Sequence, residues 1–316
     1  MFFWKAVLLL FTDFTSQTQA LPTNALTQKL VNFLSLNETD YPNGTFCFDP
    51  ATGNVSGRFF LTNVSLLTGN NIDALYVDYI KKDLDCYQHS QCLQNCSSLP
   101  KTLFSEILHS SQGRLALQFL AEERSTSSEE LKNELEYIWG LNTTYACRRG
   151  FRHVFGIERS SKRRLVGMHH KELLQYLEQI GVLKIERLFV THGRSRFPIY
   201  CAFKYRGTGK IIPADKIKRL GGALCGDYDL VQVFFLYSAC ALQMTDKRAK
   251  RKYCAYNVGP CKLHISCQSK GKNRKRISTC YVSEGKRTLA CLRFLKFEST
   301  RALNKNCFNG NATLLE

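Results

Sequence analysis

Proline and long apolar runs are both scarce in this sequence. Only 7 of its 316 residues are proline, so no long extended linker is expected between domains. The apolar stretch at residues 230–244 is interrupted by glutamine and serine. A membrane helix needs roughly 18 to 20 consecutive apolar residues. We therefore predict no membrane span and expect residues 230–244 to lie in the protein core.

The sequence also lacks the motifs that mark many active sites. It has no Gly-x-Ser-x-Gly nucleophile elbow, no His-Glu-x-x-His helix and no Walker loop. Residues 207–210, Gly-Thr-Gly-Lys, are similar to a phosphate loop but lack its first glycine at the required spacing, so a hairpin turn is expected there. We predict no catalytic residue and no cofactor, and we favour a binding protein over an enzyme.

Acidic residues are scarce in the second half of the chain. Residues 1–146 contain 9 Lys/Arg and 15 Asp/Glu, a formal charge of −6, whereas residues 147–316 contain 35 and 11, a formal charge of +24. Six of the seven Asn-x-Ser/Thr sequons fall in the acidic half. This distribution predicts one glycan-coated half and one bare cationic half. The predicted glycosylation sites are Asn37, Asn43, Asn54, Asn63, Asn95, Asn142 and Asn311.

The first twenty residues are typical of a secretory signal peptide. Lys5 precedes the apolar run at residues 6–11, and small residues at 18–20 precede a cleavage position. We therefore predict that residues 1–20 are removed and that the protein is secreted.

The cysteine content agrees with export. The chain has 14 cysteines, an even number, and in an oxidising compartment each disulfide contributes about 2–4 kcal/mol. Zinc is the alternative, at Cys86-x5-Cys92-x3-Cys96 and Cys254-x6-Cys261-x2-His264-x2-Cys267, but neither has the short paired knuckles of common zinc modules. We predict disulfides and no metal site. The predicted disulfide cysteines are Cys47, Cys86, Cys92, Cys96, Cys147, Cys201, Cys225, Cys240, Cys254, Cys261, Cys267, Cys280, Cys291 and Cys307.

Cysteine parity indicates a domain boundary. A cut in the polar stretch 122–130 leaves four cysteines before it and ten after it, so each part can close its own bridges. We predict a two-domain, disulfide-rich secreted glycoprotein of the α+β class. Residues 21–124 form an acidic N-glycosylated domain, and residues 125–316 form a basic cysteine-rich α+β domain.

Hydrophobic periodicity predicts the main elements. Residues 101–121 are expected to be helical with a break near Gly113, and a capping box at Ser127 and Glu130 begins another helix. A further helix ends at Gly181. The predicted strands lie at 57–61, 74–77, 197–205, from 231 onward, 277–283 and 288–297.

Basic clusters are the strongest functional signal. They recur after residue 147, and the aromatic residues near them, including Tyr253 and Tyr281, offer flat surfaces for stacking on a ligand. We predict a heparin-binding surface for an anionic extracellular ligand or receptor: a glycosaminoglycan, an acidic protein or a lipid head group. The predicted binding residues are Arg163, Arg164, Lys247, Arg248, Lys250, Arg251, Lys252, Lys270, Lys272, Arg274, Lys275 and Arg276. Residues 248–251, Arg-Ala-Lys-Arg, also resemble a proprotein convertase cleavage site.

A secreted hydrolase or nuclease remains an alternative. His169, His170 and His264 could exchange protons near neutral pH, as cleavage of a phosphodiester requires. Adjacent residues of a helix point about 100° apart, however, so His169 and His170 are not expected to meet one substrate atom. We expect them to be surface histidines near the start of a helix.

An intracellular nucleic-acid-binding protein is the other alternative. Cys147-x3-Phe151-x4-Gly156-Ile157, followed by Arg163-Arg164-Leu165, resembles a short segment that precedes the catalytic domain in some transposon-derived DNA-binding proteins. The resemblance covers fewer than twenty residues and assigns no functional residue. It implies reduced or zinc-bound cysteines and nucleic acid as the partner.

Overall fold

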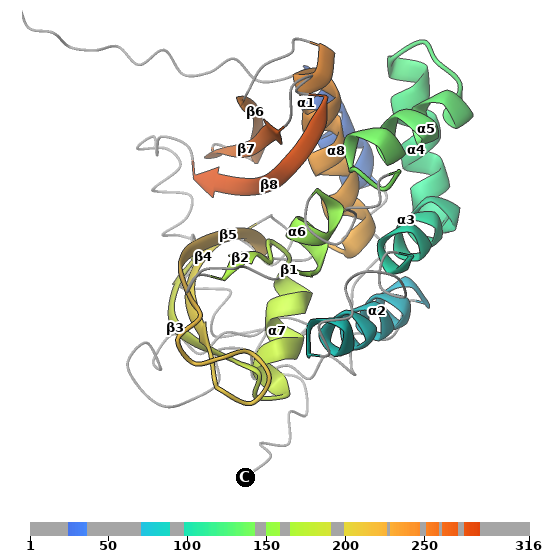
Figure 1. The fold of residues 1–316 in the computed structure, drawn as a ribbon. Helices are drawn as coiled ribbons and strands as arrows, with labels where there is room; N and C mark the ends of the chain where they lie inside the picture. Colours follow the sequence, from blue (N-terminus) through green and yellow to red (C-terminus); the bar gives the residue numbers. More distant parts are fainter. Residues whose placement is uncertain are drawn as a thin grey trace, which may run out of the picture.

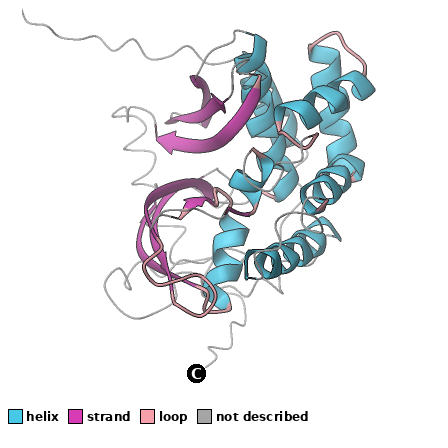
Figure 2. Cartoon of the chain, viewed as in Figure 1, coloured by secondary structure: helices cyan, strands magenta, loops and turns pink. Residues whose placement is uncertain are grey.

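The computed structural model combines a layer of helices with two three-stranded antiparallel sheets (Figures 1 and 2). It describes residues 25–36, 71–88, 98–142, 150–158, 165–190, 199–225, 228–246, 251–258, 261–270 and 275–284. The helices are α1 (Ala25–Leu36), α2 (Asn71–Gln88), α3 (Leu99–His109), α4 (Ser111–Glu123), α5 (Ser128–Ile138), α6 (Phe151–Phe155), α7 (Lys171–Gln179) and α8 (Leu230–Asp246). The strands are β1 (Ile157–Glu158), β2 (Val166–Gly167), β3 (Leu183–Val190), β4 (Ile199–Gly207), β5 (Ile217–Cys225), β6 (Arg251–Val258), β7 (Cys261–Lys270) and β8 (Arg276–Glu284).

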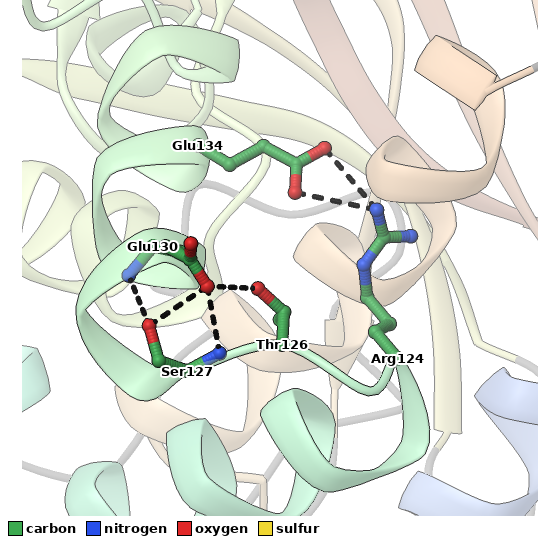
Figure 3. Close-up of polar contacts among 5 residues, drawn as sticks. All are labelled: Arg124, Thr126, Ser127, Glu130 and Glu134. Atoms are coloured by element: carbon green, nitrogen blue, oxygen red, sulfur yellow. Dashed lines mark hydrogen bonds and ion pairs between the residues drawn. The ribbon is translucent and has the colours of Figure 1, made fainter.

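The capping box predicted at the start of α5 is confirmed (Figure 3). The Ser127 hydroxyl accepts a hydrogen bond from the Glu130 amide, and the Glu130 carboxylate accepts one from the Ser127 amide at 3.0 Å. Thr126 donates to the same carboxylate, and Arg124 reaches Glu134 one turn further along α5. The side chains around the α4–α5 turn therefore satisfy amides that a helix start leaves unpaired.

The break predicted near Gly113 is confirmed at Ser110, which ends α3 and caps α4 by accepting from the Gly113 amide. A Cβ on Gly113 would lie 1.8 Å from the Ile107 carbonyl oxygen, so the bend between the two helices requires glycine there. The helix predicted to end at Gly181 is also confirmed: α7 ends at Gln179, and Gly181 has a left-handed φ of +71°.

Two predicted strands are helical instead. Residues from 231 onward belong to α8, because a continuous apolar stretch suits a buried helix as well as a buried strand and alternation within it does not discriminate. Residues 74–77 lie in α2 for the same reason. Residues 230–242 of this stretch are buried in the core, as predicted. The helix α8 packs against other helices, including α1 and α4, and against the β6–β8 sheet. Among the described residues, no helix has the length and apolar content needed to cross a membrane. The predicted strands at 57–61 and 288–297 lie outside the described residues.

Each sheet is an antiparallel meander. One has the strand order β3-β4-β5 and the other β6-β7-β8. The strands predicted at 197–205 and 277–283 are confirmed as β4 and β8. Residues 207–210 begin the hairpin connection between β4 and β5, which continues to residue 216, and the Gly209 amide donates to the Ile212 carbonyl at 2.9 Å. The expected hairpin is therefore present, with a longer connection than a tight turn.

One disulfide attaches the β6–β8 sheet to α8, and another joins two strands within the sheet. Cys240 of α8 is bonded to Cys254 of β6, and Cys267 of β7 is bonded to Cys280, its direct partner on β8. Cys86 is also disulfide-bonded. The zinc alternative at 254–267 is therefore wrong, because two of its cysteines are in disulfides, and the described residues bring no three metal-binding side chains together.

One hydrophobic core extends across the whole described chain. It includes Leu30 of α1 and Val282 of β8, and an aromatic cluster at its centre joins Trp139, Phe151 and Phe234. The Trp139 indole donates to the Ser238 hydroxyl on α8 at 2.8 Å. The core thus contains residues from both sides of the boundary predicted at 124/125, and two separate domains are not confirmed.

Candidate active site

Two histidines from different elements meet where α6 and the β1–β2 pair lie between the sheets and the helices (Figure 1). His153 lies on α6, and His169 follows β2. Backbone hydrogen bonds fix the two segments to each other: the Met168 amide donates to the His153 carbonyl at 2.8 Å, and the His169 amide donates to the Val154 carbonyl at 2.9 Å. The ring centroids are 5.6 Å apart.

The backbone before His169 has an uncommon conformation. Gly167 and Met168 both have positive φ, +74° and +58°. A Cβ on Gly167 would lie 2.0 Å from the His153 carbonyl oxygen, so only glycine permits this close approach. Positive φ at a non-glycine residue is uncommon and clusters at functional sites, where the surrounding structure compensates for the strain.

The surroundings of His169 fix its proton. The ring is almost fully buried, and its Nδ1 lies 2.9 Å from the Gly222 carbonyl oxygen on β5. Because a carbonyl can only accept, we assign the hydrogen to Nδ1, which makes Nε2 the acceptor nitrogen of the ring. Tyr281 of β8 also contacts His169, and its ring stacks on the imidazole at a centroid distance of 5.4 Å. Both sheets therefore contribute to this histidine's environment.

His153 has a carboxylate partner. Its Nδ1 is paired with a carboxylate oxygen of Glu158, the last residue of β1. Both side chains are partly exposed, at 17% and 15%. The carboxylate accepts the Nδ1 hydrogen, so Nε2 is the atom that can exchange a proton with a ligand.

A buried ion pair connects α6 to α2. The Arg152 guanidinium lies 2.7 Å from an oxygen of Asp83 on α2, and both side chains are buried. Asp83 also accepts a hydrogen bond from the Ile157 amide at 2.6 Å, and Tyr76 donates to the Phe155 carbonyl at 2.9 Å. Burial raises the pKa of Asp83, and Arg152 and the Ile157 amide act in the opposite direction. These contacts hold both ends of the short helix that carries His153.

His170 points away from this site, but not for the helical reason expected: it is the extended residue before α7, and neighbouring side chains of an extended backbone project to opposite sides. Its ring is 1% exposed and packs against Tyr76 and Phe155, at centroid distances of 5.0 and 5.6 Å. Burial, with Lys171 acting in the same direction, lowers the pKa of His170 well below the ordinary value. The expectation that His169 and His170 are surface histidines is wrong, because both are buried. His264 lies on β7, where burial and Lys262 lower its pKa.

Sequence reasoning named His169 as a candidate but did not name His153 as its partner. The two are separated by sixteen positions, including the undescribed residues 159–164. Neither a short motif nor a fixed spacing marks such a pair. The one local signal is Gly-Met-His at 167–169, because the glycine allows the positive φ that precedes His169. The sequence alone does not show which residue His169 then meets.

The structure describes part of the predicted basic surface. Arg251 and Lys252 begin β6, Lys270 ends β7 and Arg276 begins β8, so strand pairing brings these four to one end of a single sheet. Lys275 is exposed, and the Arg276 guanidinium lies 4.8 Å from the centre of the Tyr137 ring. The predicted binding residues outside the described ranges are Arg163, Arg164, Lys247, Arg248, Lys250, Lys272 and Arg274. Among the predicted glycosylation sites, Asn142 is described and exposed.

Comparison with known proteins identifies a shared fold. No protein-family profile and no curated protein sequence matches the chain. A solved structure does match: XendoU, described as a splicing-independent, snoRNA-processing endoribonuclease, with a TM-score of 0.59 and 16% sequence identity. The match covers 84% of this chain and 99% of XendoU. The chain has the XendoU fold. At this identity the likeness shows the fold alone.

Proposed function

We propose that this protein is an endoribonuclease that uses His153 and His169 as an acid–base pair. The observation that carries the proposal is the 5.6 Å distance between the two rings, each with its Nδ1 held by a fixed acceptor. A catalytic group must come within roughly 3 Å of the atom whose proton it exchanges, and two rings at this distance can both reach one phosphate group.

The partners of the two rings suggest their roles. His169, held by a backbone carbonyl and almost fully buried, suits the neutral base that removes the proton of the ribose 2′-hydroxyl. The 2′-oxygen then bonds to phosphorus as the bond from phosphorus to the 5′-oxygen breaks. His153, with a carboxylate partner suited to a positively charged ring, donates its proton to the departing 5′-oxygen. The products are a 2′,3′-cyclic phosphate end and a 5′-hydroxyl end.

RNA is the substrate class that supplies its own nucleophile in this reaction, because DNA has no 2′-hydroxyl. The charge distribution also supports a polyanionic substrate, since both histidines belong to the half of the chain with a formal charge of +24. The XendoU fold belongs to a described endoribonuclease and is the third source of support.

The test uses the full chain and a labelled single-stranded RNA. We expect cleavage that leaves cyclic phosphate ends and that falls at least 100-fold in His153→Ala and in His169→Ala, since general acid–base groups contribute typically 10²–10⁴-fold. His109→Ala changes an exposed histidine on α3 and serves as the matched control. RNA with a single 2′-deoxy sugar at the cleavage position is expected to resist cleavage. Full activity in both histidine variants would refute the proposal.

A second candidate function is binding of an extracellular polyanion at the basic end of the β6–β8 sheet. The observation that favours it is the strand pairing that collects Arg251, Lys252, Lys270 and Arg276 there. Retention on a heparin column that falls when these four are replaced by glutamine would support it. Equal retention of the wild type and the variant would refute it.

We also propose export and N-glycosylation. Disulfides form mainly in oxidising compartments, and the exposed Asn142 is accessible to a glycan. A glycosidase that shifts the mobility of protein from secreting cells would support this, and unmodified protein with an intact Met1 would contradict it.

A further inference from the structure

The β6–β8 sheet has one apolar face and one polar face. In antiparallel pairs, directly opposite residues project to the same side, and neighbours along a strand alternate between sides. One side carries the fully buried Cys254, Ile265, Cys267 and Val282, which belong to the core. The other side must therefore be the one that faces the histidine pair, because it carries Tyr281.

Three residues form a row across this polar face. Tyr253 of β6 pairs with Ser266 of β7, and Ser266 pairs with Tyr281 of β8. We call these three residues the tyrosine row. Neighbouring strands lie about 4.8 Å apart, so the backbones of the two tyrosines are roughly 10 Å apart. Tyr281 lies against His169 at one end of the row, and Tyr253 is at the other end on a strand that borders the sheet.

The two rings are the groups that this row offers to a ligand. Tyr253 is 39% exposed, one of two large apolar or aromatic side chains that are exposed among the described residues. Ser266 is fully buried, and its hydroxyl has no hydrogen-bond partner among the described residues. Tyr281 is partly exposed, and its hydroxyl accepts from the Gln268 amide at 3.4 Å, which orients the ring on the same face.

We propose that Tyr253 is a base-stacking position for a single-stranded RNA that extends from the histidine pair across the tyrosine row. The proposal rests on the proposed function. Aromatic side chains on an open sheet face bind unpaired bases by stacking. A distance of roughly 10 Å corresponds to about three nucleotides at the 3.4 Å spacing of a stacked strand.

Charge favours a nucleic acid over an uncharged occupant. Basic residues precede both tyrosines in sequence: Arg251 and Lys252 begin β6, and Lys275 and Arg276 lie at the start of β8. Aromatic rings on strands that begin with basic residues suit a ligand that alternates flat bases with phosphates.

Binding and cleavage are tested separately. Fluorescence anisotropy with a labelled 2′-O-methyl oligoribonucleotide of twelve residues measures binding without cleavage, because the 2′-oxygen is blocked. We expect Tyr253→Ala to weaken binding by roughly 5- to 100-fold, the effect of losing one base–aromatic stack. Tyr253→Phe keeps the ring and is expected to bind as the wild type does. Leu115→Ala removes the other exposed large side chain, on α4, and is the matched control.

A substrate series locates the effect. A dinucleotide is too short to reach Tyr253 from the histidine pair, so Tyr253→Ala is expected to cleave it with unchanged kcat/KM while losing efficiency on the twelve-residue RNA. If the wild type cleaves RNA and Tyr253→Ala binds the oligonucleotide as tightly as the wild type does, the stacking position is refuted and the proposed function survives. If the wild type does not cleave RNA but its binding depends on the Tyr253 ring, the proposed function fails and the stacking position survives.

Discussion

Removing the charge of Asp83 is expected to destabilise the fold strongly. Asp83 on α2 and Arg152 on α6 are buried with an N–O distance of 2.7 Å. Asp83→Asn keeps an oxygen that can accept from the Ile157 amide, so the change isolates the charge. Leaving one charge of a buried pair without its partner costs about 3–5 kcal/mol, a large part of a total stability of about 5–15 kcal/mol.

A double substitution separates the charge from the packing. Asp83→Leu with Arg152→Met replaces both charged groups by apolar side chains, which is often neutral or stabilising for an ion pair. The Ile157 amide then loses its acceptor, at a cost of about 1–3 kcal/mol. We therefore expect the double variant to be more stable than Asp83→Asn, although less stable than the wild type.

Urea unfolding followed by circular dichroism measures these differences, with the single variant Arg152→Met completing a thermodynamic cycle. The expected result is a large coupling between the two positions. A loss below about 1 kcal/mol in Asp83→Asn, or additive effects of the two single changes, would refute a buried, energetically coupled pair.

The remaining predictions address pH, backbone conformation and helix capping. Burial raises the pKa of Glu172 from 4.5 to about 8; Lys171 opposes this shift, and Asp73 and Asp229 reinforce it. Between these two pH values the folded chain retains a proton that the unfolded chain releases. The free energy of unfolding should therefore fall as pH rises from about 4.5 to 8. Urea midpoints across this range should show a shallower fall in Glu172→Gln, with a residual slope from Asp73, whose pKa burial raises to about 7; identical slopes would contradict this. Gly167→Ala forces a Cβ to within 2.0 Å of the His153 carbonyl, so we expect a loss of more than about 1 kcal/mol in stability and reduced RNA cleavage, whereas Gly140→Ala, with positive φ but no atom within 4 Å, should cost stability alone. Ser127→Ala should lower the free energy of unfolding by about 1 kcal/mol without changing cleavage, and a change in cleavage would link the α4–α5 turn to the site.

Elements with local determinants were predictable from the sequence. The capping box at Ser127, the turn at 207–210 and the end of α7 at Gly181 each depend on residues within a few positions of one another. The strand at 277–283 alternates because one side of the sheet is core and the other is not. The helix α8 was predicted as strand because its surroundings bury it on several sides, and a residue pattern then carries no information on which side is exposed.

The site was not predictable in the same way. His153 and His169 meet because the backbone after Gly167 is hydrogen-bonded to α6. No residue pattern near His153 predicts this pairing. The roles proposed for the two rings depend on the Gly222 carbonyl and the Glu158 carboxylate, and Gly222 belongs to a strand fifty-three residues away from His169. The tyrosine row likewise requires the register of three strands.

The fold shows which half of the chain contributes each residue of the candidate site. Both histidines, Glu158 and Tyr281 come from the basic half of the chain, as a site for a polyanion requires. A cationic short helix such as α6, with Arg152 beside His153, needs a buried counter-charge to be held in place. Asp83 provides it from α2, in the acidic half. Under the proposed function, the basic half contacts the substrate and the acidic half fixes the geometry. A cut between the two halves is therefore expected to abolish cleavage even if each part folds.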